Sequence, residues 1–138
     1  MNVQAYLFFD GRCDEALAFY REALGAEVSA LMRFKENPDP AGCAPGTEEK
    51  VMHCNFTIGT TQLMASDGNC KSAPSFQGFS LTINADSAEE AERLFAALSD
   101  GGQVQMPLSQ TFFSPRFGMV ADRFGVSWMV LVAQEGHA

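Results

Sequence analysis

His53 is the side chain in this 138-residue sequence that is best suited to acid–base chemistry, and it lies inside a β-rich stretch, VMHCNFTIG. A histidine titrates near neutral pH and can therefore act as a general acid or base. The second histidine, His137, lies outside any predicted element. His53 is our candidate catalytic residue, weighed against the commoner role of a strand histidine as a hydrogen-bonded part of a pocket or surface.

A metal ion at His53 would need ligands from elsewhere in the chain. The adjacent Cys54 points to the opposite face of the same predicted strand and cannot bind the same ion. Asp67 and Cys70 are conceivable partners, but zinc sites normally need three or four nitrogen, sulfur or oxygen ligands. We therefore predict no metal site and no cofactor, and we expect Asp67 to shape the turn after its strand.

Composition narrows the classes of partner. The formal net charge of -8 and the pI near 4.6 disfavour nucleic acid and anionic membranes, because both attract a basic surface. The four cysteines have no CxxC spacing and no export signal precedes them, so we expect free thiols and a cytoplasmic protein. Apolar runs such as 128–133 are far shorter than the ~20 residues of a membrane helix.

The first half of the sequence predicts a strand, a helix and three further strands. The helix begins at Asp14, whose charge favours a helix N-terminus, carries an apolar stripe and ends at Gly25. A loop rich in proline and glycine is expected over Glu36–Lys50. The strands are expected at Val3–Phe9, Glu27–Phe34, Val51–Ile58 and Gln62–Ser66, with a tight hairpin at 59–61.

The second half repeats this order. Ser87 and Glu90 form a capping box at the start of its helix, and Gly101 ends it. The strands are expected at Gly78–Asn84, Val104–Phe113, Phe117–Ala121 and Val126–Val132. The sequence therefore predicts an α+β protein of two βαβββ modules, at about 1–70 and 75–138, with a core rich in phenylalanine.

Alternation along the strands separates a polar face from an apolar one. The polar faces hold His53, Asn55 and Thr57, then Gln62, Met64 and Ser66, then Ser80, Thr82 and Asn84. The opposite faces hold Cys54, Phe56, Ile58, Leu63, Phe79, Leu81 and Ile83. Alternation alone would leave the polar faces exposed to solvent.

Several stretches resemble a known superfamily. FYREALG near the first helix and DRFG before the last strand resemble the vicinal oxygen chelate superfamily, which includes glyoxalase I, extradiol dioxygenases and bleomycin-resistance proteins. VMHCNFTIG, LMASD and PLSQTFFSPRFGMVADRFGVSWMV are similar to its PhnB-like branch, except at Phe113 and Ser114, where that branch has Trp-Gly. The resemblance implies curled mixed sheets around a cleft, and a homodimer.

The same resemblance implies that no inherited metal site is present. Metal-dependent members take ligands from positions that correspond to Ala5, Ser80 and Met129, with a fourth near Met64, and these side chains suit a hard or borderline divalent ion poorly. The branch is often named after a demethylubiquinone methyltransferase. The sequence has no glycine-rich loop after a strand for a nucleotide-like cofactor, so we set that activity aside.

The resemblance also implies that helices cover the apolar faces and that the polar faces line a ligand-binding cleft. The residues expected there are Ala5, Leu7, His53, Asn55, Met64, Ser80, Thr82, Arg116 and Met129, and Arg116 could bind a carboxylate or phosphate. Our leading hypothesis is a metal-independent protein that binds an unknown small molecule, amphipathic or cationic. The alternative is a lyase, dioxygenase or transferase-type enzyme with a non-standard metal site or His53 as its acid–base group; a structural role ranks third.

Overall fold

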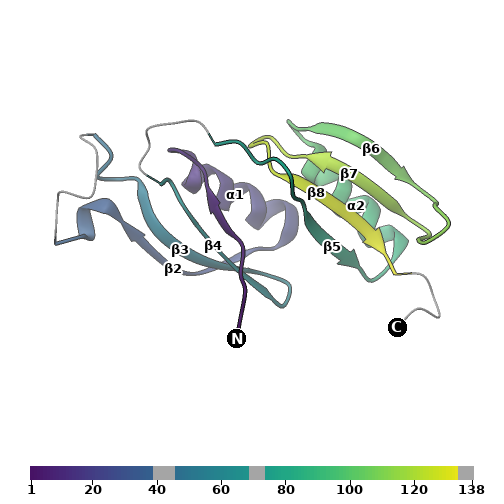
Figure 1. Ribbon diagram of the computed structural model, residues 1–138, viewed down its shortest axis with the longest axis horizontal. Coiled ribbons are helices and arrows are strands. Elements are labelled where there is room, and N and C mark those ends of the chain that lie inside the picture. Colours follow the sequence, from purple (N-terminus) through teal and green to yellow (C-terminus); the bar gives the residue numbers. More distant parts are fainter. Residues whose placement is uncertain (39–45, 69–73, 134–138) are drawn as a thin grey trace. The chain divides into compact units, whose positions relative to one another are not determined.

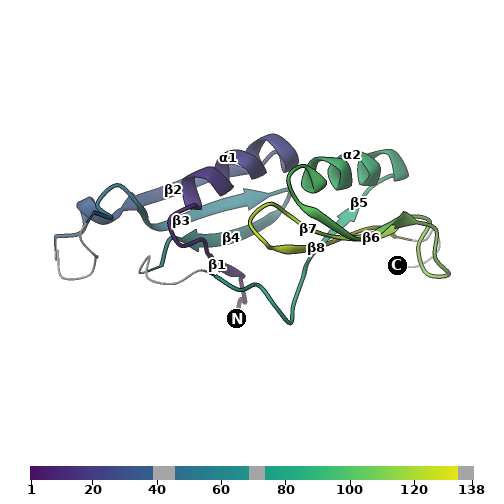
Figure 2. The same cartoon turned by 90° about the horizontal axis from the view of Figure 1, so that it is seen from above.

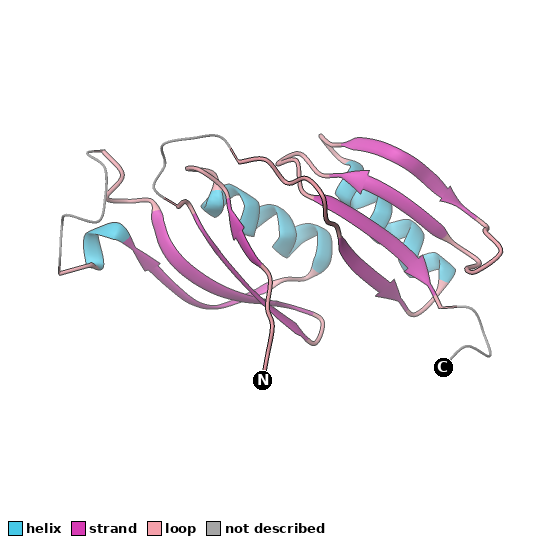
Figure 3. Cartoon of the chain, in the orientation of Figure 1, coloured by secondary structure: helices cyan, strands magenta, loops and turns pink. Residues whose placement is uncertain are grey.

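The chain forms two compact units, Met1–Pro74 and Ser75–Ala138. The computed structural model describes residues 1–38, 46–68 and 74–133 (Figure 1). Each unit contains one long helix and one four-stranded sheet, as Figure 3 shows by colour. The predicted α+β class and the order strand, helix, three strands are therefore confirmed in both halves.

The first unit pairs its first and last strands within an open four-stranded sheet. Its elements are β1 (Tyr6–Phe8), α1 (Cys13–Leu24), β2 (Glu27–Arg33), the short 3-10 helix η1 (Phe34–Glu36), β3 (Val51–Ile58) and β4 (Thr61–Ser66). The spatial order is β1-β4-β3-β2, with β1 parallel to β4 and the other pairs antiparallel. Such a parallel pair needs a long crossover, which α1 and the following strands supply.

The second unit repeats this topology. Its elements are β5 (Leu81–Ala85), α2 (Ala88–Ser99), β6 (Gln103–Ser109), β7 (Phe117–Ala121) and β8 (Ser127–Val132). The order is β5-β8-β7-β6, again with a single parallel pair, β5 with β8. Pro107 lies in β6, an edge strand whose register with β7 is irregular on both sides of Met106, as expected for a proline in a sheet.

Local sequence signals give most element boundaries correctly. Gly25 ends α1 in the left-handed conformation at φ 70°, and the Ser87 side chain accepts a hydrogen bond from the Glu90 amide at 3.1 Å. The third strand of the second half, predicted to reach Phe113, ends at Ser109. A turn replaces its end, because the Ser114 amide donates to the Thr111 hydroxyl and the Thr111 amide to the Ser114 carbonyl.

Each helix lies along one face of its own sheet, as Figure 2 shows. In the first unit Tyr20 of α1 is fully buried and its ring stacks on Phe56 of β3, with ring centroids 6.3 Å apart. In the second unit α2 packs so closely on β7 that a Cβ at Gly118 would lie 2.8 Å from the Phe95 ring. Only part of the expected phenylalanine core exists, because side chains such as Phe112, at 93% exposure, lie outside it.

Asp67 joins three separate segments of the first unit. Its carboxylate is 1% exposed, and it accepts hydrogen bonds from the backbone amides of Gly11, Cys13 and Val51, each at 2.8 Å. No side chain of the preceding residue Arg12 caps α1, so Asp67 provides the acceptor that its N-terminus needs. The turn that we expected Asp67 to shape continues into residues 69–73, which lie outside the described residues.

Asp122 plays a comparable part in the second unit. Its buried carboxylate accepts from the amides of Phe124 and Val126 at 2.9 and 3.1 Å, and from the indole nitrogen of Trp128 at 2.9 Å. The DRFG motif is thus the turn between β7 and β8. Asp122 also satisfies the one polar group of the buried Trp128, as a buried indole requires.

The thiols of Cys13 and Cys54 lie together beneath α1. Their sulfur atoms are 3.9 Å apart and both side chains are fully buried. Hydrogen bonding to Cys54 and burial raise the pKa of Cys13, and the hydrogen bond with Cys13 lowers the pKa of Cys54. Neither helix in the described part of the chain is long and apolar enough to cross a bilayer.

Replacing Asp67 by asparagine should lower the free energy of unfolding by about 2–4 kcal/mol, measured by urea denaturation. Asparagine keeps the shape but has one acceptor oxygen for three amide donors. The matched control is Asp86→Asn, at an exposed position, with an expected change below about 0.5 kcal/mol. Equal effects of the two variants would contradict the role assigned to Asp67.

Candidate functional site

The face of each sheet that lies away from its helix, here called the open face, carries the polar side chains. On β3 the fully buried Cys54 and Phe56 face α1, while His53 and Asn55 are half-buried on the opposite side. In the register of the sheet, Asn55 lies beside Met64, and Met64 lies beside Tyr6. The open face of the first unit thus brings together three of the predicted site residues: His53, Asn55 and Met64.

A continuous hydrogen-bonded chain crosses this face. The Tyr6 hydroxyl lies 3.0 Å from Nδ1 of His53, and Nε2 of His53 lies 3.1 Å from Oδ1 of Asn55. An amide oxygen can only accept, so Nε2 carries the proton and Nδ1 of the neutral ring accepts from Tyr6. The Tyr6 and His53 rings also contact each other, with centroids 5.5 Å apart.

This arrangement suits proton transfer better than metal binding. Both ring nitrogens of His53 already have partners, and the Asp67 oxygens hold three backbone amides on the buried side. His53 and Asp67 therefore do not form the non-standard metal site considered above. The third conceivable ligand, Cys70, lies outside the described residues. Within residues 1–38, 46–68 and 74–133, no three side chains of His, Cys, Asp or Glu are grouped to hold a metal ion.

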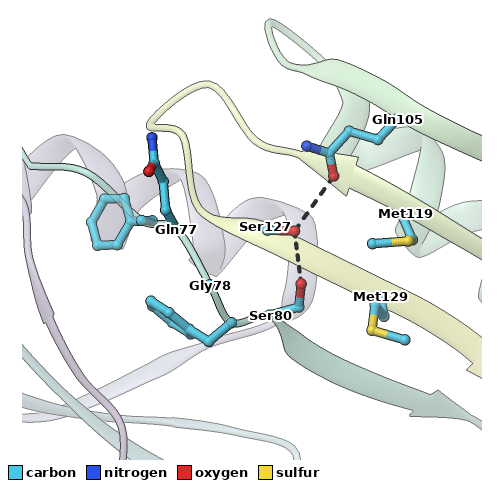
Figure 4. Close-up of a pocket in the computed structure, with 9 residues that line it drawn as sticks. Gln77, Gly78, Ser80, Gln105, Met119, Ser127 and Met129 are labelled. Carbon is cyan, nitrogen blue, oxygen red and sulfur yellow. Dashed lines mark hydrogen bonds between the residues drawn. The ribbon is translucent and has the colours of Figure 1, made fainter.

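The open face of the second unit contains a shallow hollow of about 560 Å³. Ser80, just before β5, approaches Ser127 of β8 with their hydroxyl oxygens 2.8 Å apart, and the Ser127 hydroxyl lies 3.4 Å from Oε1 of Gln105 (Figure 4). Met119 and Met129 are register neighbours on β7 and β8 and also line the hollow. The predicted site residues Ser80 and Met129 are thus brought together.

Thr82 belongs to the same open face. It lies beside Met129 in the register of β5 and β8, and its hydroxyl contacts the Met129 sulfur at 3.9 Å. Ala5 is half-buried, and its carbonyl accepts the amide of Met64 at 3.0 Å. A single cleft that combines residues of both units stays a prediction.

Two predicted cleft residues lie on the wrong side of their sheets. Leu7 is 1% exposed and lies in register with the fully buried Ala65, so it belongs to the core beneath α1. Arg116 forms an ion pair with Glu92 of α2, with Nε and Oε1 3.2 Å apart, and therefore lies towards the helix. The Leu7 prediction fails because strand alternation fixes which residues share a face but not which face the helix covers. Arg116 lies just before β7, and its pairing with Glu92 joins residues 24 positions apart, which no strand pattern records.

The residues that sequence reasoning missed are Tyr6, Gln105, Met119 and Ser127. The first strand is apolar on both sides, with Tyr6 and Phe8 on one and Leu7 and Phe9 on the other, so alternation could not select the open side. Only its pairing with β4 decides this, through the Tyr6–Met64 register. Gln105, Met119 and Ser127 come to line the hollow through pairing between strands, which no local sequence pattern reveals.

Comparison with known proteins identifies close relatives over nearly the whole chain. The family model described as 3-demethylubiquinone-9 3-methyltransferase matches residues 1–131. Protein YjdN of Escherichia coli K12 is 34% identical over 98% of this chain and 97% of its own length. The crystal structure of protein PA1353 from Pseudomonas aeruginosa is 41% identical, with a TM-score of 0.86 and coverage of 98% of this chain and 99% of that one.

Two further structures relate the fold to named groups. A PhnB protein from Bacillus cereus, described as a 3-demethylubiquinone-9 3-methyltransferase, is 30% identical. Its structure has a TM-score of 0.82, and the match covers 96% of this chain and all of that one. A glyoxylase/bleomycin resistance protein/dioxygenase domain from Frankia sp. EAN1pec, at 12% identity and a TM-score of 0.68, covers 97% of this chain and 98% of its own. The second likeness shows the fold alone.

The Tyr6–His53–Asn55 chain predicts one tautomer of His53. In a His137→Gln background, nitrogen-15 NMR of the neutral ring should show the proton on Nε2, and Tyr6→Phe should shift the Nδ1 resonance while Nε2 changes little. Thr57→Val, on the same face of β3, is the control and should move neither resonance. A neutral His53 with its proton on Nδ1 would refute the assigned hydrogen-bond directions.

Proposed function

The chain belongs to the PhnB-like family described as 3-demethylubiquinone-9 3-methyltransferase, and from this premise we propose that it binds a small molecule without the help of a metal ion. The supporting observation is the composition of its two open sheet faces. Each combines hydrogen-bonded polar side chains with apolar ones, Tyr6–His53–Asn55 beside Met64 and Ser80–Ser127 beside Met129. Binding sites for small molecules have this mixture of apolar walls and a few placed polar groups.

We also propose that the family is a branch of the vicinal oxygen chelate superfamily. The fold shared with the glyoxylase/bleomycin resistance/dioxygenase domain supports this placement. Where metal-dependent members of that superfamily carry ligands, this chain has Ala5, Ser80 and Met129 by the alignment above. Their side chains supply no carboxylate or imidazole, which supports binding without a metal.

Methyl transfer is not part of the proposal, because neither long helix offers a free N-terminus, and the sequence offers no glycine-rich loop, for a nucleotide-like methyl donor. The N-termini of both long helices, which could bind an anionic group of such a donor, are already closed. The Asp67 carboxylate caps α1 and the Ser87 hydroxyl caps α2. The family description therefore names an activity that the site of this chain does not explain.

An enzyme is the second candidate function, favoured by the Tyr6–His53–Asn55 chain. A histidine held between a hydroxyl donor and an amide acceptor is positioned to move a proton to or from a ligand on the open face. In such an enzyme His53→Ala should reduce turnover by roughly a hundred-fold or more. A binding protein should instead show a change in affinity of only a few-fold.

A homodimer is the remaining part of the proposal. Phe8, Val104 and Met106 are between 43% and 54% exposed, and a partner would remove such large apolar side chains from water. Sedimentation velocity over a range of concentrations measures this directly. A single monomeric species throughout would refute it.

The binding proposal predicts that a screen of metabolites and antibiotics contains a compound that stabilises chelator-treated protein. At a ligand concentration of 100 times Kd the melting temperature should rise by about 5–10 °C, because ligand binds only the folded state. Elemental mass spectrometry on the same sample measures its metal content. Stabilisation that needs restored Zn, Ni, Mn or Fe would overturn metal independence, and a screen without any stabilising compound would overturn binding.

Variants of the two open faces locate the stabilising compound. Met129→Ala tests the second unit and His53→Ala the first, and Asp86→Ala, at an exposed position outside both faces, is the control. We expect one of the first two to weaken binding several-fold and the control to leave it unchanged. Equal binding by all three variants would exclude the open faces as the binding site.

A further inference from the structure

The hollow in the second unit is built without formal charge. Its polar side chains are Gln77, Ser80, Gln105 and Ser127, and among the described residues that line it none is charged. The arginines near β7 are held elsewhere, Arg116 by Glu92 and Arg123 by Asp100. An ionised ligand would gain no counter-charge from this lining to offset the water that it loses on contact, so the lining favours an uncharged ligand.

Three of the polar side chains of the hollow form a hydrogen-bonded chain that still offers a donor group and an acceptor to a ligand, in addition to the side-chain amide of Gln77. The Gln105 oxygen can only accept, so the Ser127 hydroxyl donates to it at 3.4 Å, and the Ser80 hydroxyl donates to Ser127 at 2.8 Å. Figure 4 shows this chain from Ser80 through Ser127 to Gln105, and its order leaves the Gln105 NH2 group and the lone pairs of the Ser80 oxygen available to a ligand. They match a carbonyl or ether oxygen and an N–H or O–H group on a ligand.

The apolar part of the hollow suits a flat ring. Met119 and Met129 are half-buried neighbours across β7 and β8, and Phe79, at 48% exposure, stands among the lining residues. Thioethers pack favourably against aromatic rings and adapt their shape to them. Methionine and phenylalanine together therefore favour an aromatic compound over a flexible polar one.

We propose that this hollow binds an uncharged, planar aromatic compound that carries a hydrogen-bonding group. This inference rests on the proposed binding function and names the class of its ligand. The net charge of -8 alone would favour a cation, but the interaction of a bound ligand is decided by the side chains that it contacts, and these are neutral.

A matched pair of fluorescent probes tests the class. N-phenyl-1-naphthylamine is uncharged, and 8-anilinonaphthalene-1-sulfonate has the same ring system with one sulfonate added. In fluorescence titrations of the full chain we expect the uncharged probe to bind at least roughly tenfold more tightly. Equal or tighter binding of the sulfonate would overturn the assignment.

Two substitutions place the probes in the hollow. Ser127→Arg adds a guanidinium at its floor, and Gln77→Arg adds one at an exposed lining position in case the first variant fails to fold. Each should weaken the uncharged probe and strengthen the sulfonate, so that the ratio of affinities falls by roughly tenfold or more. Ser109→Arg, the control, adds the same charge at an exposed position of β6 outside the hollow and should leave the ratio unchanged.

The outcomes separate this inference from the function on which it rests. An unchanged ratio in both folded hollow variants, or no binding of either probe, overturns the aromatic class. The binding function itself fails only if no compound in the thermal screen stabilises the protein. A charged compound that stabilises the wild type but not Met129→Ala would overturn the inference, while the proposed binding function would stand.

Discussion

The buried carboxylate of Asp67 is the constraint on which the first unit depends. It stands at the end of β4 and holds the amides of Gly11, Cys13 and Val51, so the last strand, the start of the helix and the start of β3 share one acceptor group. A buried carboxylate is costly unless such donors saturate it. With them it fixes where α1 begins and ties that point to the start of β3 and the end of β4. The second unit uses Asp122 in a similar way, to bind the β7–β8 turn and Trp128.

Covering one face of each sheet leaves the chemistry to the other. The helix-facing sides hold Cys54, Phe56, Val120 and Val130, all fully buried, and the open sides hold the histidine, the hydroxyls and the thioethers. On the open sides the polar groups bind each other, as Tyr6, His53 and Asn55 do. Polar groups that are already paired and ordered can accept a ligand without first being rearranged, which keeps the cost of binding low.

Family membership and site chemistry give different kinds of information about this protein. The family description names a methyltransferase, and the relatives at 30–41% identity match 96–98% of this chain. Yet a fold does not carry an activity, which belongs to the residues of the site. Here the mixture of polar and apolar side chains on the open faces and the uncharged lining of the hollow support our proposal of small-molecule binding, while the His53 chain is the feature that an enzyme would use.

The sequence by itself determined the order of elements and the composition of each strand face. Capping at Ser87, the left-handed glycine at Gly25 and two-residue alternation are local properties, and they were predicted correctly because they depend on residues a few positions apart. Only the tertiary structure decided which face is open, that Leu7 is core and Tyr6 is not, and that Arg116 turns to Glu92. These features join residues far apart in the chain, 54 positions for Cys13 and Asp67 and 47 for Tyr6 and His53. A shift of one residue in a strand would turn every side chain to the opposite face. Long-range pairing, which no local pattern records, therefore decided which side chains lie on the open face.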